Sequence, residues 1–349
     1  MYKYDTFLKY YLGIIILFLM FHYTVWDKFT SKIFNLSENE MVGDLGRMSY
    51  IVDSLTNRTN LQKPNKLIRG DEFRGQKIEM ITVGTSFSRG AGGGENSFYQ
   101  DYIANNSNIN VLNVRPLENS IETIIILINS GFIDKYRPKY VLLESIERQC
   151  VPGFSKKIDF DLSMDIKKLL YIIREKKDAD PKLNLKFINF NNYNALIYHV
   201  LYYFSNNAYY SKVFQLNLDQ DFFSVKNSAK LLFYHEDIVN LKLSTNESIQ
   251  QLNNNLNLLA MTLEEKGCKL IFMPIPDKYT LYSEFIKNNP YHKSEFFELL
   301  RPLHKDYLFI DTKDILLTAL RNGEKDIYYS DDTHWSWKAP KIIFSKIIL

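Results

Sequence analysis

Hydrophobic residues recur along much of this chain in short runs that are separated by amphipathic stretches. Apolar runs typical of buried strands cover residues 78–83, 111–114 and 140–143. Between them, residues 98–105 and 121–128 have the composition of helices. Strands that alternate with helices at this spacing indicate a parallel sheet with helices on both faces.

The same alternation resumes in the C-terminal third of the chain. Ser244 and Glu247 have the spacing of a capping box at the start of a helix, and Gly267 marks the end of that helix. Four leucines share one stripe of it, at positions 252, 256, 259 and 263. Later elements are a buried strand over 269–273, a short strand over 308–310 and a closing helix over 339–348.

The N-terminal segment has a different pattern. From Tyr10 to Trp26 there are 17 residues without a charge, which as a helix would extend roughly 25 Å, enough to cross a bilayer. Lys3 and Lys9 precede this stretch, and aromatic residues stand at both of its ends, where membrane interfaces favour them. No Ala-x-Ala cleavage site follows, so we expect an uncleaved single-pass anchor with the remaining chain on the periplasmic or extracellular side. The alternative is a buried core helix.

The pattern divides the chain into three parts. Residues 1–30 form the expected membrane anchor, and residues 31–75 mix polar and short apolar stretches, which indicates a linker that leads into the domain. Residues 76–349 form the α/β domain. Within it, residues 151–243 are rich in tyrosine and asparagine, and we expect a helical insertion over one edge of the sheet.

Composition excludes several classes of protein. Hydrophobic residues make up 46% of the chain, so a folded core is expected and disorder is not. The net charge of +3 comes from interspersed charges without a basic block, and we expect no nucleic-acid partner. No CxxC motif or cluster of Cys and His has metal-ligand spacing, so neither a metal nor another cofactor is expected. We expect Cys150 and Cys268 to be two buried thiols, although they could pair in an exported protein.

Two short polar segments carry candidate chemistry. Ser86 follows the first strand of the α/β domain, after Gly84 and Thr85, and so stands at the carboxyl edge of the sheet, where open α/β folds bind their ligands. Near the C-terminus, Asp332 and His334 are two residues apart, a spacing that in an extended segment puts both side chains on one side. Serine, histidine and aspartate are the parts of a nucleophilic triad.

Each segment also has a purely structural interpretation. A serine beside a glycine is common in loops, and Asp-Asp-Thr-His could form a surface turn that caps the last helix. Asp331 competes with Asp332 as the carboxylate that orients the imidazole. Trp335 and Trp337 flank the histidine and could form an apolar wall that excludes water.

Together, Gly84-Thr85-Ser86 and Asp332-Thr333-His334-Trp335 resemble the motifs of the SGNH hydrolase superfamily, and more narrowly those of AlgX/AlgJ-type O-acetyltransferases of exported polysaccharides. Residues 143–148 are similar to the Glu-x-x-Glu-Arg element that follows a central strand in that family. Residues 273–282 are similar to its Pro-x-Pro-Asp-Lys stretch followed by a tyrosine. The resemblance covers residues of about 76–150 and 245–349 but not the insertion.

The resemblance implies a flavodoxin-like three-layer α/β/α domain outside the cytoplasm, with a mostly parallel sheet. It implies Ser86 as nucleophile, His334 as base and Asp332 as the residue that orients the base. An acetyl group would pass through an acyl-serine to a hydroxyl of a cell-surface or exported polysaccharide, and an integral membrane acyltransferase would deliver the acetyl donor. The alternatives are a glycan esterase with the same triad and a non-catalytic glycan-binding assembly protein.

The oxyanion hole is the least defined part of the resemblance. The Gly-x-Asn-Asp block that supplies an oxyanion asparagine in SGNH hydrolases is not evident, and Gly90 to Gly94 lie where a helix often begins after the serine. Arg148 and Lys278 are candidates to hold a charged sugar or the oxyanion, or else to form salt bridges at strand ends. Thr85 and Trp335 are further candidates for oxyanion or substrate binding.

Overall fold

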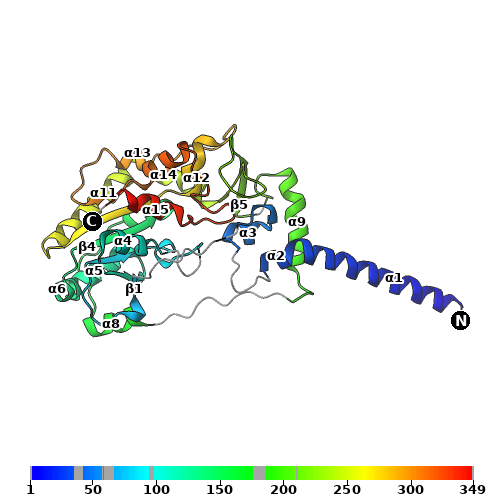
Figure 1. The fold of residues 1–349 in the computed structure, drawn as a ribbon, viewed down its shortest axis with the longest axis horizontal. Coiled ribbons are helices and arrows are strands. Elements are labelled where there is room, and N and C mark those ends of the chain that lie inside the picture. The colour runs from blue at the N-terminus through cyan, green and yellow to red at the C-terminus, as the bar shows by residue number, and fades with distance from the viewer. Residues whose placement is uncertain are drawn as a thin grey trace.

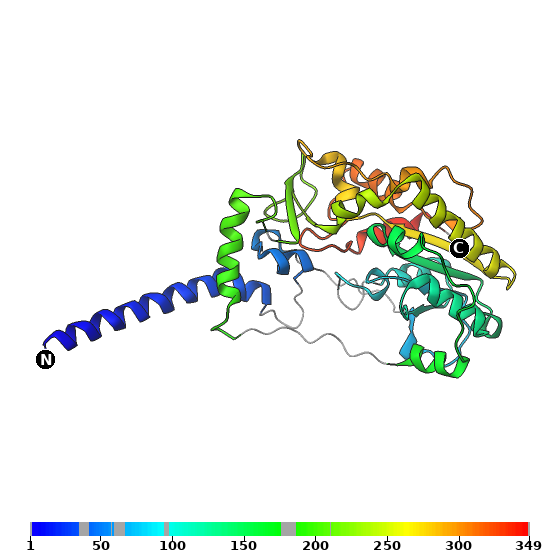
Figure 2. The same ribbon diagram turned by 180° about the vertical axis from the view of Figure 1, so that it is seen from behind.

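The structure is a computed structural model that describes residues 2–34, 42–56, 58, 67–93, 98–175, 186–209 and 211–347. A long N-terminal helix extends away from an α/β body (Figure 1). Seen from behind, the same helix leaves the body beside a second helix, α9 (Asn191–Phe204), which runs across its end (Figure 2).

The body is built around a six-stranded sheet in which neighbouring strands are parallel. The strand order is β1-β3-β2-β4-β7-β8. Without the edge strand β1 this is the 2-1-3-4-5 order of flavodoxin-like folds. The order in which successive strands are added to the sheet reverses between β2 and β4, although all strands stay parallel. The predicted α/β/α fold is therefore confirmed. The strands are β1 (Leu67–Arg69), β2 (Met80–Val83), β3 (Val111–Val114), β4 (Tyr140–Ile146), β7 (Lys269–Ile275) and β8 (Leu308–Phe309).

Helices cover both faces of the sheet because successive strand residues point to opposite sides. In β4, Val141 and Leu143 belong to one buried apolar cluster, and Leu142 belongs to a second. The first cluster includes α5 (Ser120–Asn129), α6 (Phe132–Tyr136), α7 (Glu147–Phe154), α8 (Ile166–Arg174), α11 (Asn246–Glu264) and α13 (Phe296–Leu300). The second includes α4 (Tyr99–Ser107), α12 (Lys278–Tyr282), α14 (Thr312–Arg321) and α15 (Lys338–Ser345).

The start of α11 differs by one residue from the prediction. Thr245 accepts a hydrogen bond from the N–H of Ser248 at 3.2 Å, and the hydroxyl of Ser248 accepts one from the N–H of Thr245 at 2.9 Å. The capping box predicted from Ser244 and Glu247 is therefore wrong. The four predicted stripe leucines are buried, and Gly267 follows the helix with a left-handed φ of 70°.

Two segments contain more structure than predicted. The insertion has the expected helices, but it also forms a two-stranded antiparallel sheet of β5 (Val213–Asn217) and β6 (Lys230–Tyr234). The segment 31–75, predicted as a linker, supplies β1 and also α3 (Asp44–Ser49). The domain boundaries stay a prediction, but part of this linker belongs structurally to the α/β body.

The N-terminal helix is longer than the predicted span. α1 (Tyr2–Val25) continues through the π-helical turn η1 (Trp26–Thr30) into α2 (Ser31–Phe34). The helix is long and apolar enough to cross a membrane, and most of its large side chains are exposed, so it is not a buried core helix. Cys150 and Cys268 are both buried and free, as expected.

Candidate active site

Ser86 stands at the carboxyl edge of the sheet, directly after β2. It begins the short 3₁₀ helix η4 (Phe87–Arg89), and the side chain of Ser86 is half-buried. The direction of the strand order reverses between β2 and β4, and open α/β sheets bind ligands at such a switch point.

A buried carboxylate shapes the turn that carries Ser86. Glu144, in β4, accepts hydrogen bonds from the backbone N–H and hydroxyl of Thr85, at 2.9 and 2.6 Å. It accepts two more from the N–H and hydroxyl of Ser88, at 3.1 and 2.8 Å. A Cβ at position 84 would lie 2.3 Å from a Glu144 oxygen, so only glycine fits there. Glu144 belongs to the Glu-x-x-Glu-Arg element of the sequence, but its role at this turn was not predicted.

The three predicted triad residues meet at this edge. The Ser86 Oγ and His334 Nε2 atoms are 2.7 Å apart. On the other side of the ring, His334 Nδ1 lies 2.7 Å from Asp332 Oδ1, and the same oxygen accepts the His334 backbone N–H at 3.0 Å. The arrangement lets the imidazole take a proton from the serine while the carboxylate holds its tautomer.

The electrostatics of the site favour a charged imidazole. Burial alone would lower the pKa of His334, but the negative charge and hydrogen bond of Asp332, with a contribution from Asp44, raise it above its usual value. Burial would raise the pKa of Asp332, but His334 and Arg58 hold it well below its usual value. Asp332 is therefore ionised beside the ring and is placed to stabilise an imidazolium.

Asp331 does not contact the imidazole ring. Its carboxylate accepts the backbone N–H of Gly43 at 2.9 Å and binds the Arg58 guanidinium at 3.2 Å. Arg58 also binds Asp332 at 2.9 Å and donates to the carbonyl oxygen of Gly92. The structure therefore favours Asp332 over Asp331 as the orienting carboxylate. Arg58 lies in the predicted linker, and no local sequence signal marks it.

Asp44 is a second carboxylate close to the histidine. It accepts the backbone N–H of Thr333 at 2.8 Å and the Thr333 hydroxyl, and its nearer oxygen lies 3.9 Å from His334 Nδ1. Burial, followed by the charge of Asp332, raises the pKa of Asp44 to about 6. Because Asp44 and Thr333 are 289 positions apart, sequence spacing could not reveal this contact.

Asp44, Asp332 and His334 also place their ligand atoms close enough to hold a metal ion. In this structure those atoms bind one another or Thr333, and the Arg58 cation adjoins Asp332. The three groups are therefore engaged in the hydrogen-bond network around His334.

Lys278 lies beneath the histidine loop and is directed to the backbone of that loop. Its ammonium group is buried and donates to the carbonyl oxygens of Tyr329, Ser330 and Asp332, at 2.7, 2.9 and 3.0 Å. Burial lowers its pKa to about 8. In this arrangement Lys278 shapes the loop that carries Asp332 and His334, and its candidate role in substrate or oxyanion binding stays a prediction.

The other predicted binding candidates differ in what they can contact. Both hydrogen-bond donors of Thr85 are directed to Glu144, so neither is free to stabilise an oxyanion. Trp335 is buried, and its ring meets Phe87 at 5.0 Å, so it supports the site from within. Arg148 forms ion pairs with Asp277 and with Asp237, and so the predicted alternative of a strand-end salt bridge is observed.

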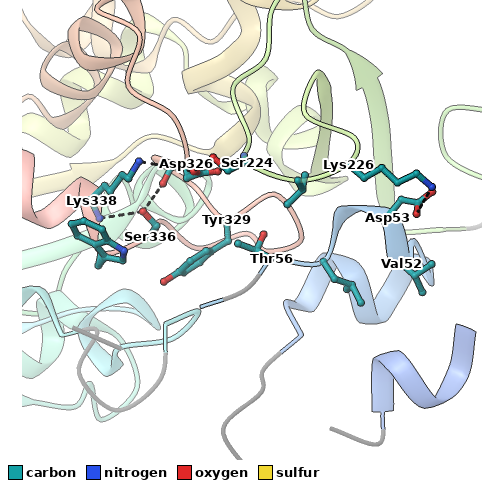
Figure 3. A pocket seen from close by; sticks show the side chains of 12 residues that line it. Val52, Asp53, Thr56, Ser224, Lys226, Asp326, Tyr329, Ser336 and Lys338 are labelled. Carbon is teal, nitrogen blue, oxygen red and sulfur yellow. Dashed lines mark hydrogen bonds and ion pairs between the residues drawn. The ribbon is translucent and has the colours of Figure 1, made fainter. Parts of the chain in front are cut away.

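Two cavities adjoin the site. One, of about 450 Å³, lies at the carboxyl ends of β2, β3 and β4 and includes Thr85, Asn119, Ser145 and Arg148 in its lining. The other lies beyond the histidine loop (Figure 3), and the lining of neither cavity includes a triad side chain. Tyr329 lines this second cavity, and its ring lies 4.4 Å from the guanidinium carbon of Arg58. Its other labelled residues are Val52, Asp53, Thr56, Ser224, Lys226, Asp326, Ser336 and Lys338.

The comparison with protein families gives one match. Residues 226–341 match the family described as the SGNH hydrolase-like domain of the acetyltransferase AlgX. This confirms the predicted resemblance for the part of the chain that carries Lys278, Asp332 and His334, whereas Ser86 lies outside the matched residues. No curated protein and no solved structure matches the chain.

Proposed function

We propose that this chain, whose SGNH hydrolase-like domain is similar to that of AlgX, is an O-acetyltransferase that uses Ser86 as its nucleophile. The observation that carries the proposal is the continuous hydrogen-bonded chain from the Ser86 hydroxyl through His334 to Asp332. This geometry matches the roles of nucleophile, base and orienting acid in serine enzymes.

In the first half of the reaction, neutral His334 takes the hydroxyl proton as Ser86 Oγ attacks the carbonyl carbon of an acetyl ester. The tetrahedral intermediate then collapses, the imidazolium returns the proton to the leaving alcohol, and the acetyl group is left on the serine. The N–H of Ser86 is the expected first oxyanion donor, because the first N–H groups of a helix have no partner within it.

In the second half, a sugar hydroxyl replaces the leaving alcohol. His334 takes its proton, the sugar oxygen attacks the acetyl carbon, and the proton returns to Ser86 when the ester product departs. The cavity beside Thr85 and Arg148 opens at the same edge of the sheet and is the space that we assign to the reacting groups. The acceptor is a hydroxyl of a cell-surface or exported polysaccharide.

The proposed setting is the outer side of a membrane. α1 and its continuation anchor the chain as a single span, and the α/β body lies on the periplasmic or extracellular side. An integral membrane acyltransferase is the proposed source of the acetyl donor. This arrangement brings donor and acceptor to the same surface.

The test is acetyl transfer from 4-nitrophenyl acetate to an added oligosaccharide by the full chain in detergent. Ser86→Ala should lower the rate of acetyl transfer by about 10³-fold or more, because alanine has no hydroxyl to carry the acetyl group from donor to acceptor. Ser345→Ala, an exposed serine on α15, is the matched control and should keep full activity.

The products distinguish the two enzymatic functions. Acetyl groups on the oligosaccharide support the transferase, whereas free acetate alone identifies an esterase with the same triad. Normal glycan acetylation by Ser86→Ala would contradict the assignment of the nucleophile.

A further inference from the structure

The end of the body from which α1 leaves carries a continuous exposed apolar surface. α9 contains no Asp, Glu, Lys or Arg. Most of its exposed residues are large and apolar and form its outward face, and the exposed polar residues Asn194 and His199 flank that face. Tyr203 is 86% exposed and Phe204 is 70% exposed. Exposed apolar surfaces of this kind mark sites of interaction. The outward residues are Tyr193, Ile197, Val200, Tyr203 and Phe204.

The inward face of α9 is already occupied. Ala195 is buried in a cluster with Val25 and Ile33 of the N-terminal helices. His199 meets the ring of Phe29 at 5.2 Å. α9 is therefore fixed against the end of α1 and η1, as both views show (Figures 1 and 2), and its outward face is the one that is available.

The residues before α9 extend the same surface. Ile188 is 76% exposed and Phe190 is 86% exposed. The neighbouring Phe187 is tied to α1, because its carbonyl oxygen lies 2.9 Å from Nε2 of His22 and its ring lies 5.9 Å from that of Trp26.

The contact between Phe187 and His22 sets the depth of this surface along α1. His22 precedes Asp27, the first charged residue after the apolar stretch, by five positions, which is about 7 Å along a helix. If α1 spans a bilayer, His22 therefore lies within the last turns of the span. Ile188 and Phe190 then lie at the depth where bilayers favour aromatic and apolar side chains.

We propose that α9 and residues 186–190 form an interfacial membrane-binding element, with the outward face of α9 immersed in the leaflet from which α1 emerges. The proposal rests on the membrane anchor assigned above. Lipid is the favoured occupant because this surface continues the exposed apolar surface of α1 at the depth that α1 defines, and Lys186 is the one charged residue between 186 and 204. Two contacts with the bilayer hold the α/β body in one orientation.

The experiment uses the full chain in vesicles of phosphatidylethanolamine and phosphatidylglycerol, without any other protein. Single cysteines are introduced as Ile197→Cys and Phe204→Cys and labelled with an environment-sensitive fluorophore, while Cys150 and Cys268 are buried in the fold. Phe18→Cys in α1 reports on the anchor. Met261→Cys, an exposed apolar position on α11, is the control for labelling of the body.

Lipids that carry a spin label near the headgroup should quench the fluorophores at positions 197 and 204 at least twofold and leave the fluorophore at position 261 unchanged. Lipids that carry the spin label near the end of the acyl chain should quench the fluorophore at position 18, which is the midpoint of residues 10–26. Quenching at position 18 without quenching at 197 and 204 would overturn the proposal and leave the membrane anchor in place. That result would favour a protein as the partner of this surface. Absence of quenching at all three positions overturns both the anchor and the proposal.

Discussion

Two carboxylates lie beside the imidazole of His334, and the Arg58 guanidinium links one of them to a third. Asp332 binds the ring, Asp44 lies 3.9 Å from it, and Asp331 is held aside by Arg58 and the backbone of Gly43. The histidine is therefore poised toward its charged form, which is the form produced when it takes the proton of the nucleophile.

The charge of Asp44 should appear in the pH dependence of the reaction. His334 must be neutral to act as a base, so activity falls as pH drops through its raised pKa. Asp44→Asn removes one negative charge that raises this pKa, and the acid limb of the kcat/KM profile should move to lower pH.

The control for this measurement is Asp134→Asn, which removes the same charge from α6, at the opposite edge of the sheet. Its profile should match the wild type. An acid limb that stays in place, or moves to higher pH, in Asp44→Asn would show that this carboxylate does not act on the histidine.

At the scale of elements, the site depends on two turns that pack against each other. Glu144 shapes the turn after β2, and Lys278 shapes the histidine loop. The glycine-rich stretch also contributes, because Gly92 has a φ of 88° and an added Cβ would lie 2.5 Å from the Cβ of His334.

Gly92→Ala should therefore displace His334 and lower kcat at least about tenfold, since small misplacements of catalytic groups are costly. Gly323→Ala is a matched control, because Gly323 has a similar φ of 86° but open space around it. The control should lose about 1 kcal/mol of stability and no activity. Equal kinetic effects in the two variants would refute a steric role for Gly92.

Helices and strands could be predicted where the hydrophobic pattern of the sequence is periodic. Contacts between segments that are distant in the sequence could not be predicted. The strands before and after Ser86 are short apolar runs with clear ends, and the structure has them within a few residues. β5 and β6 were missed because they lie in a segment whose tyrosine and asparagine content conceals alternation. The cap of α11 was misplaced because Ser244 and Thr245 are adjacent and both can cap a helix.

The same limit applies to the site. Ser86, His334 and Asp332 could be singled out from the sequence as a proposed triad, since each lies in a short motif. Asp44, Arg58 and Glu144 were not, because their roles depend on tertiary contacts across the fold.

For the whole molecule, the segment after the N-terminal helix supports the histidine loop. Asp44 and Arg58 bind it through their side chains, and the Gly46 N–H donates to the carbonyl oxygen of Asp331 at 2.9 Å. The part of the chain that adjoins the proposed anchor therefore packs against the loop that carries Asp332 and His334.

Arg58→Gln tests how much this segment stabilises the histidine loop. It leaves Asp331 and Asp332 buried without their cation, so the free energy of unfolding should fall by about 3 kcal/mol in a denaturant titration. The matched control is Lys226→Gln, which breaks the exposed ion pair with Asp53 of the same segment and should change stability by less than about 1 kcal/mol. Similar losses in both variants would contradict a special role for Arg58.

The acyl-enzyme is the species on which this account depends. The protein would be mixed briefly with 4-nitrophenyl acetate, quenched in acid, digested and analysed by mass spectrometry. The account predicts an acetyl group on Ser86 in the wild type, its loss when an oligosaccharide acceptor is added before the quench, and its absence in His334→Gln. Turnover without acetylation of Ser86, or acetylation of Ser86 that does not depend on His334, would contradict it.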